Sequence, residues 1–263
     1  MGNKWMRGWP PLAVIALFAA AWEAAVRLFA IEPYILPSPS AIVREAMQPN
    51  VWPRLQMHTL ATVWRTLTGL ALGVLGGIVL AAAIHLTPGA RRALAPLLVL
   101  SQSVPVIVLG PLLLIWLGFG EEPKIVLIML VCFFPVTVAM LTGLRESDPA
   151  LLSYLAMIGA GRWTIFTKLE LPNAVPYLFS GFRIAAAYSV TTTVAAEWLG
   201  ASSGLGYYIK LSYSGFETAR IFAGTIIIIA FSMLMFGAAA LAERLVVRWR
   251  PKAERRNDHA SGA

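Results

Sequence analysis

Long apolar runs constrain this chain more than any other feature. They recur six times, at about residues 10–29, 60–86, 94–117, 125–144, 174–199 and 221–247. An α-helix of about 20 apolar residues crosses the hydrocarbon core of a bilayer. Because lipid offers the backbone no hydrogen-bond partners, only helices and closed barrels span it. The runs therefore predict an all-α integral membrane protein, with six transmembrane helices in one domain covering residues 1–263.

Composition supports this prediction. Of the 263 residues, 58% are hydrophobic and 13% are charged, and the mean hydropathy is +0.72. An ordinary soluble domain carries about 25% charged residues. The net charge of +8 gathers at the ends of the apolar runs and in the C-terminal tail, so it indicates contact with lipid headgroups and no nucleic-acid partner.

The placement of positive charge predicts the orientation. With six spans, one side carries Lys4, Arg7, Arg91, Arg92, Arg145, Arg162, Lys168 and the basic tail at 248–256. The opposite side carries Arg44, Arg54, Lys124 and Lys210, more sparsely. Cytoplasmic loops are enriched in Lys and Arg, so both termini and the connection at 145–172 are expected in the cytoplasm and residues 200–215 outside. The first run also has the composition of a signal peptide, and its cleavage stays an alternative.

Residues that could carry catalysis are scarce. The single Cys132 excludes an internal disulfide, and His58, His85 and His259 are too scattered to match a metal-ligand spacing. No GxxxxGK[ST] loop is present, so the chain has no phosphate cradle of that kind. We expect neither a metal nor a cofactor nor an enzyme activity, and any ATP hydrolysis must come from a partner.

The connection at 145–172 is the longest stretch of mixed polarity. Asp148 and Pro149 are suited to start a helix. Apolar residues then recur at helical spacing until a break at 159–161, and a second short helix is expected at about 162–169, ended by Pro172. Two short amphipathic helices with an unburied apolar face suit docking onto another protein.

The same connection resembles the cytoplasmic loop of ABC importer permeases, whose pattern is EAA-x3-G-x9-I-x-L-P. Gly159 and Leu171-Pro172 are in register, and Leu169 stands where the pattern has isoleucine. The first triplet departs from the pattern and reads Ser153-Tyr154-Leu155. The segments LPSPS at 36–40 and AEWLG at 196–200, the latter followed by GLG at 204–206, resemble the nitrate, sulfonate, taurine and thiamine-precursor pyrimidine group.

The resemblance implies the small six-span fold of a type I ABC importer permease in a bacterial inner membrane. It implies two copies around a central path, two ATPase subunits that each grip one cytoplasmic loop, and a binding protein that delivers a small polar solute. The ATPase-coupling residues implied are Ala156, Ile158, Gly159, Ala160, Trp163, Phe166, Leu169 and Pro172.

Polar residues within two runs are candidates for the translocation path: Gln102, Ser103, Pro105, Ser189, Thr192, Thr193 and Glu197. No Arg or Lys is among them, and Glu197 near the outer mouth would repel an anion. A neutral or weakly cationic solute, such as a thiamine-precursor pyrimidine, is therefore favoured over nitrate or a sulfonate. In the alternative, the binding protein alone selects the solute and Glu197 bonds to the backbone of the outer loop.

Two other functions fit six spans less well. A secondary transporter or channel would need no ATPase, but coupling-ion sites usually place carboxylates within the membrane, and the third, fourth and sixth runs have none in their middles. A membrane enzyme would need a nucleophile–base pair, which the sequence does not show. In the second run, Gly69, Gly73, Gly76 and Gly77 predict close helix packing, with a pore-lining stripe as the alternative.

Overall fold

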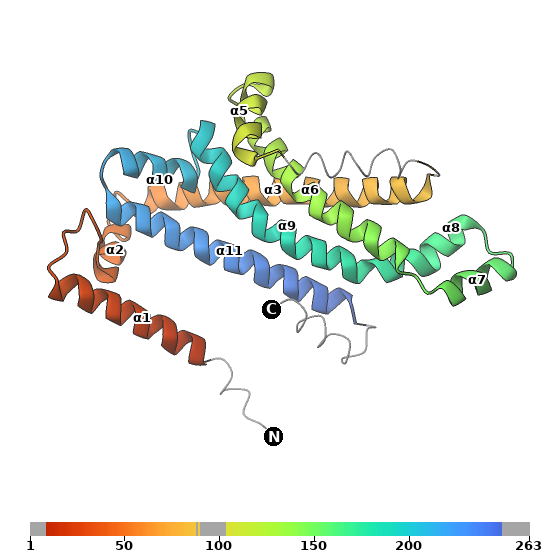
Figure 1. Cartoon of the computed structure of the whole chain (residues 1–263). Coiled ribbons are helices and arrows are strands. Elements are labelled where there is room, and N and C mark those ends of the chain that lie inside the picture. The colour runs from red at the N-terminus through yellow and green to blue at the C-terminus, as the bar shows by residue number, and fades with distance from the viewer. Residues whose placement is uncertain (1–8, 88, 90–103, 249–263) are drawn as a thin grey trace. The chain divides into compact units, whose positions relative to one another are not determined.

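The computed structural model describes residues 9–87, 89 and 104–248, and every regular element in them is a helix (Figure 1). The helices are α1 (Trp9–Leu28), α2 (Pro39–Ala46), α3 (Trp52–Leu86), α5 (Val106–Leu117), α6 (Glu122–Arg145), α7 (Pro149–Met157), α8 (Arg162–Ile165), the π segment (Phe166–Glu170), α9 (Leu171–Gly200), α10 (Leu205–Ser214) and α11 (Thr218–Val246). The all-α prediction is confirmed for this part of the chain.

Three of the described helices, α3, α6 and α11, are long and apolar enough to cross a membrane. Helices α1 and α9 cover the first and fifth apolar runs, and α5 covers the described end of the third. The count of six spans therefore stays a prediction. Helix α3 begins at Trp52, earlier than its apolar run, because Pro53 is suited to a first helical turn.

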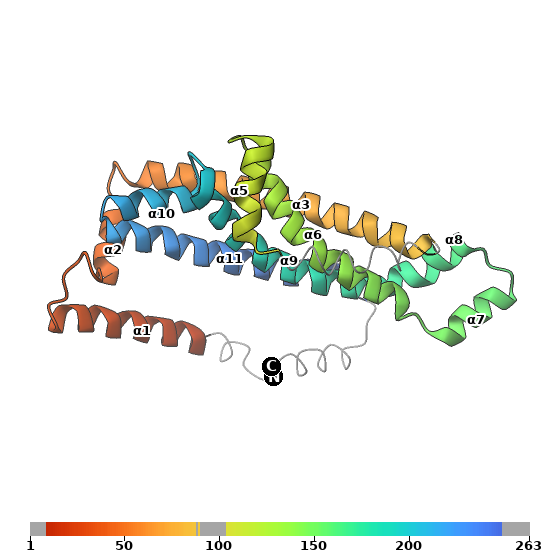
Figure 2. The same cartoon turned by 45° about the horizontal axis from the view of Figure 1, so that its top comes forward.

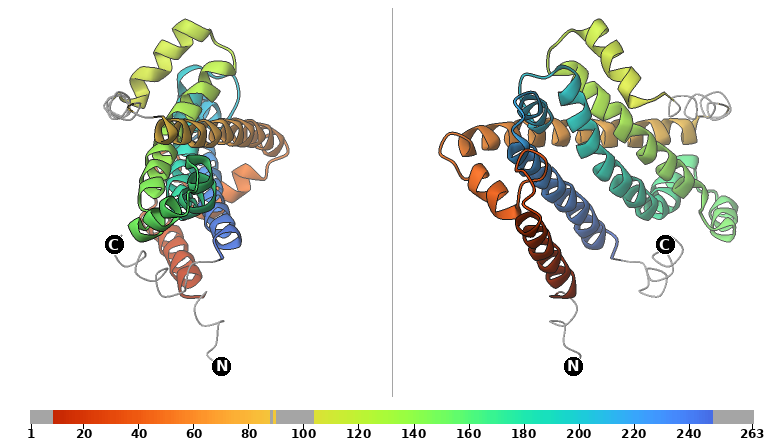
Figure 3. Two further views of the ribbon diagram at one scale, coloured as in Figure 1. Left: turned by 90° about the vertical axis from the view of Figure 1, so that its right-hand side faces the viewer. Right: turned by 60° about the vertical axis from the view of Figure 1, so that its left-hand side comes forward.

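The chain divides into two compact units, residues 1–63 with 201–230 and residues 64–200 with 231–263. In the first unit, a core of Ile42, Leu55, Leu205, Tyr208 and Ala223 joins α2, α3, α10 and α11. Figure 3 shows α10 beside the start of α11. Whether the whole chain acts as one domain stays a prediction.

The glycine- and serine-rich sequence at 200–215 predicts a loop, but most of the segment is helix α10. The segment turns at Gly204, whose φ of +104° favours glycine. The Gly204 amide donates to His58 Nδ1 at 3.1 Å, and the Leu205 amide donates to Thr62 Oγ1 at 2.7 Å. Side chains of α3 thus satisfy the free amides at the start of α10.

Glycines of the second unit allow its helices to pack closely, because a side chain at these positions would clash. A Cβ added at Gly73 would lie 2.7 Å from both Cys132 Cβ and the Met129 carbonyl oxygen of α6. One added at Gly69 would lie 2.6 Å from the Ile128 side chain. These glycines face α6 as predicted for close packing, so for them the pore-lining alternative is wrong. Helices α6 and α9 also run side by side (Figures 1 and 2).

Pro172 does not end a short helix, so that prediction is wrong. Helix α8 continues through the π segment directly into α9, and Pro172 is the second residue of α9. The Leu171 amide donates to the Phe166 carbonyl, five residues earlier. The wider π turn changes the backbone spacing at the point where a proline would otherwise interrupt the helix.

Candidate functional site

Helix α7 is capped at both ends by the residues that directly flank it. At the start, the Ala150 amide donates to Asp148 Oδ1 at 2.8 Å, with Pro149 in the first turn. At the end, Gly159 has φ of +76°, and the Ala160 amide donates to the Leu155 carbonyl at 2.9 Å. The predicted helix start and the break at glycine are confirmed, and a side chain at position 159 would be strained.

The apolar side chains of α7 and α8 are largely uncovered within the described chain. No residue of α7 is buried, and Met157 and Trp163 are 78% and 66% exposed. Both helices lie beyond the ends of α6 and α9 (Figures 1 and 2). An exposed apolar patch on a supported helix is typical of a protein interaction site.

The predicted coupling residues separate into an exposed and a buried set. Ala156, Ile158, Gly159, Trp163 and Pro172 are exposed, while Ala160 and Leu169 are half-buried. The other member, Phe166, packs in a core with Ile84 and Leu144. Its ring centroid lies 5.5 Å from that of Trp163. Phe166 therefore packs between the core and the exposed Trp163, and it is not part of the exposed surface.

A cluster of two charged side chains and a histidine, absent from the sequence-based site, lies at the base of this connection. Glu170 is buried, and its Oε1 and Oε2 lie 3.0 Å from Arg162 Nη1 and 2.8 Å from His85 Nε2. Arg162 Nη2 is 2.9 Å from the same histidine nitrogen. We call these three residues the basal cluster. Glu170 and His85 are 85 residues apart, so helical spacing could not reveal the contact.

The predicted path residues do not lie together along one open channel. Thr193 and Ser189 of α9 are fully buried. The Thr193 hydroxyl donates to the Ser189 carbonyl at 2.8 Å and lies 2.9 Å from the Thr66 hydroxyl of α3. Pro105 is exposed at the start of α5. Gln102 and Ser103 lie outside the described residues.

Glu197 is not an exposed negative charge, so the expectation that it repels an anion is wrong. The alternative, in which Glu197 bonds to the backbone at 200–215, stays a prediction. Its side chain is fully buried, and Oε1 accepts a hydrogen bond from Arg65 Nη1 at 2.8 Å. The Arg65 guanidinium also donates from Nη2 to Glu121 Oε1 at 2.8 Å, and Lys124 Nζ is 3.3 Å from that oxygen. Hydrogen bonds from Arg65 hold the pKa of Glu121 below its usual value. Arg65 balances the Glu197 charge, so repulsion of an anion by Glu197 is no longer an argument.

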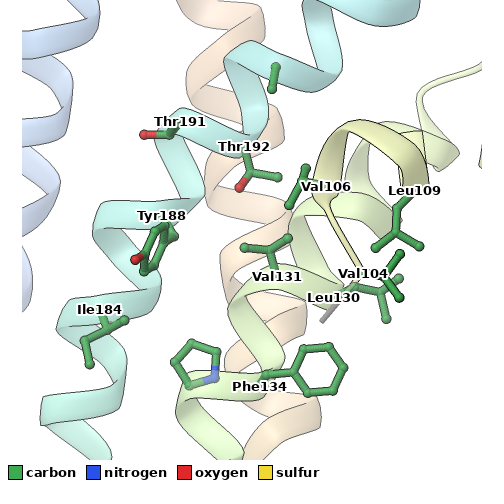
Figure 4. Close-up of a pocket in the computed structure, with 12 residues that line it drawn as sticks. Val104, Val106, Leu109, Leu130, Val131, Phe134, Ile184, Tyr188, Thr191 and Thr192 are labelled. Carbon is green, nitrogen blue, oxygen red and sulfur yellow. The ribbon is translucent and has the colours of Figure 1, made fainter. Parts of the chain in front are cut away.

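A cavity of about 550 Å³ lies between α5, α6 and α9. It is lined by Val104, Val106, Leu109, Leu130, Val131, Phe134, Pro135, Ile184, Tyr188, Thr191, Thr192 and Ala195 (Figure 4). Among the described residues that line it, the polar side chains are the hydroxyls of Tyr188, Thr191 and Thr192, and none is charged. Of the predicted path residues, it includes Thr192. Cavities of this size suit a small organic ligand.

Residues 73–248 match the family of binding-protein-dependent transport system inner membrane components. The chain belongs to this family. It is 32% identical to the formylaminopyrimidine transport permease protein ThiX of Halalkalibacterium halodurans, over 92% of this chain and 96% of the relative. It is also 32% identical to the taurine transport system permease protein TauC of Escherichia coli, over 89% and 87% of the two chains. The resemblance to ABC importer permeases is confirmed.

Solved structures support the same fold. The inward-facing MetNI methionine ABC transporter matches with a TM-score of 0.64 at 20% identity, covering 76% of this chain and all of that chain. A bacterial ABC transporter that imports alginate matches with a TM-score of 0.56 at 16% identity, covering 92% and 99%. The chain therefore has the fold of a type I ABC importer permease. As a member of this family, it is an inner membrane protein.

Proposed function

We propose that this permease imports a small uncharged solute, working as a pair of identical copies with two ATPase subunits and a substrate-binding protein. The docking surface for the ATPase is the exposed apolar face of α7 and α8, which includes Met157, Ile158 and Trp163. The observation that carries this assignment is that a membrane-family chain presents large apolar side chains, Met157 and Trp163 among them, beyond its own core. Burial of such a patch against a partner would stabilise the complex.

The proposed orientation places both termini and the 145–172 connection in the cytoplasm, and α10 outside. The support is the asymmetry of Lys and Arg between the two sides. Six spans are part of this proposal. Without a phosphate cradle in the sequence, the ATPase subunits supply the hydrolysis, and the permease alternates between two states that its partners bias.

The solute class follows from the cavity between α5, α6 and α9. Its described lining combines the Phe134 and Tyr188 rings with threonine hydroxyls, and no cation is among these described residues. A site for an anion would place cations or helix N-termini at the charge. Among the relatives are permeases named for formylaminopyrimidine and riboflavin, and others named for taurine and aliphatic sulfonates. The lining favours a neutral heteroaromatic solute, of the pyrimidine type, over a sulfonate or nitrate.

The test is uptake into vesicles that contain the permease and its ATPase, with the binding protein supplied. We expect saturable, ATP-dependent uptake of a formylated aminopyrimidine and none of taurine. Uptake of taurine or nitrate alone would contradict the solute class. Uptake without ATP or ATPase would favour a secondary transporter or channel.

A variant in the cavity tests whether the permease takes part in selection. Tyr188→Ala removes a ring and a hydroxyl from the lining, and the apparent KM for uptake should rise. Tyr213→Ala is the matched control, because Tyr213 is an exposed tyrosine outside the cavity. If Tyr188→Ala transports as the wild type does, selection belongs to the binding protein alone.

A further inference from the structure

The basal cluster joins three separate segments of the permease. His85 lies in the last turn of α3, Arg162 is the first residue of α8, and Glu170 is the last residue of the π segment. Each carboxylate oxygen of Glu170 has its own partner, Arg162 at 3.0 Å and His85 at 2.8 Å. The cluster thus links the start of α8 to the end of the π segment, and it links both to the end of α3.

Apolar packing surrounds the cluster on the same elements. Phe166, within the π segment, is buried in a core with Ala81 and Ile84 of α3 and with Met140 and Leu144 of α6. The centroids of the His85 and Phe166 rings are 6.2 Å apart. The end of α3, the end of α6 and the start of α9 therefore meet beneath the exposed face of α7 and α8.

The cluster includes the last residue of the π segment. A π segment replaces the usual helical hydrogen bonds between residues 166 and 170, and such segments occur frequently at functional sites. A buried carboxylate with two polar partners holds its place firmly, because losing a partner would leave a charge uncompensated in a low dielectric. The side chains of the cluster therefore fix a turn that the backbone alone would hold less well.

We propose that Glu170 is a positioning residue. It makes the connection at 145–172, which carries α7 and α8, move as one body with the end of α3. Motion imposed on the exposed face then reaches α3 through Arg162, Glu170 and His85. Glu170 contacts neither solute nor ATPase in this scheme. The inference rests on the proposed function, because it requires an ATPase that moves the connection.

The main test is Glu170→Gln in the complete complex of permease, ATPase and binding protein. Glutamine keeps the shape of the side chain but removes its charge. The complex should assemble and hydrolyse ATP, while solute uptake per ATP falls about fivefold or more, the lower end of typical coupling between sites. Glu122→Gln is the matched control, an exposed carboxylate in the first turn of α6 and outside the 145–172 connection, and it should leave that ratio unchanged.

Exchanging the two charges tests whether the Arg162–Glu170 pair itself is what coupling requires. Arg162→Glu alone places two carboxylates together and should uncouple uptake from hydrolysis. Adding Glu170→Arg restores an opposite pair, and the ratio of uptake to hydrolysis should recover, as expected for two residues that act together. Failure of the double variant to exceed either single variant would overturn the proposal.

Two further results would also overturn it: a Glu170→Gln complex that couples like the wild type, or one that loses its ATPase or disappears from the membrane. Hydrogen exchange on the isolated permease in detergent gives a readout that needs no transport. Amides of residues 162–170 should exchange faster in Glu170→Gln than in the wild type, and equal rates would contradict the role of the cluster. A wild-type complex without ATP-driven uptake contradicts the proposed function instead.

Discussion

Arg65 of α3 and Glu197 of α9 form a fully buried ion pair, with Arg65 Nη1 2.8 Å from Glu197 Oε1. The side chains are 3% and 0% exposed. Charged groups inside a membrane protein face the interior and pair with one another, because lipid cannot solvate them. The two residues are 132 positions apart in the sequence, so the pair links two helices that are distant along the chain. It defines the register between α3 and α9, together with the contact of the Thr66 and Thr193 hydroxyls.

Removing one member of this pair should destabilise the permease. Glu197→Ala leaves Arg65 buried with its remaining contacts, and breaking a buried pair typically costs about 3–5 kcal/mol. We expect a lower Tm in detergent and less protein in the membrane. Glu121→Gln is the control, because the Glu121 side chain is half exposed and Glu197 still balances the Arg65 charge in this variant. The loss of stability should therefore be smaller. Equal stability of Glu197→Ala and Glu121→Gln would contradict the structural role of Glu197.

Gly73→Ala should destabilise the contact between α3 and α6. The new Cβ would lie 2.7 Å from the Met129 carbonyl oxygen, a backbone atom that cannot move aside by rotation. Overpacking of this kind typically costs about 1–3 kcal/mol. Gly237→Ala in α11 is the control, since a Cβ there meets nothing within 4 Å and alanine favours the helix. Thermal unfolding of both variants in detergent measures the difference, and similar Tm values would contradict the packing.

Local rules explain which features the sequence could predict. Asp148 and Pro149 predict a helix start because both cap residues adjoin the helix, and Gly73 predicts close packing because lipid-embedded helices use small residues for it. The Glu197–Arg65 and Glu170–His85 contacts depend on how distant segments pack, which spacing along one helix does not contain. One signal was available: a cation such as Arg65 within an apolar run requires a partner.

The same distinction explains two wrong expectations. The sequence at 200–215 predicts a loop because the amide partners at the start of α10, His58 and Thr62, come from α3 and not from an adjacent cap. Pro172 predicts a helix end because the rule for proline assumes regular α-helical spacing, which the π segment changes. In both cases a tertiary or unusual backbone contact outweighed a local preference.

Gly159→Val should uncouple the ATPase from the permease without preventing membrane insertion. The φ of +76° at Gly159 is costly for a residue with a Cβ, and most so for a β-branched one. The end of α7 would therefore shift, and with it Ile158 on the exposed face. The measurement is uptake per ATP hydrolysed in vesicles, with ATPase binding followed by co-purification.

Two neighbouring variants serve as controls for Gly159→Val. Gly161→Ala should be tolerated, since φ there is −67° and a Cβ meets nothing within 4 Å. Ser153→Ala should also be mild, because within the described part of the chain the Ser153 hydroxyl bonds only to the Pro149 carbonyl of its own helix at 2.9 Å. A Gly159→Val permease that binds its ATPase and transports normally would contradict the assignment of this connection to ATPase coupling.

Thiol labelling in intact cells tests the proposed orientation. Cysteines replace Ser202 or Gly161, both of which are exposed, in a Cys132→Ser background that removes the buried native thiol. The asymmetry of Lys and Arg places position 202 outside and position 161 in the cytoplasm, so an impermeant reagent should label the first and not the second. Both should react once the membrane is permeabilised, which shows that position 161 is accessible. Labelling of position 161 alone in intact cells would reverse the orientation and would rule out α7 and α8 as the surface that meets a cytoplasmic ATPase.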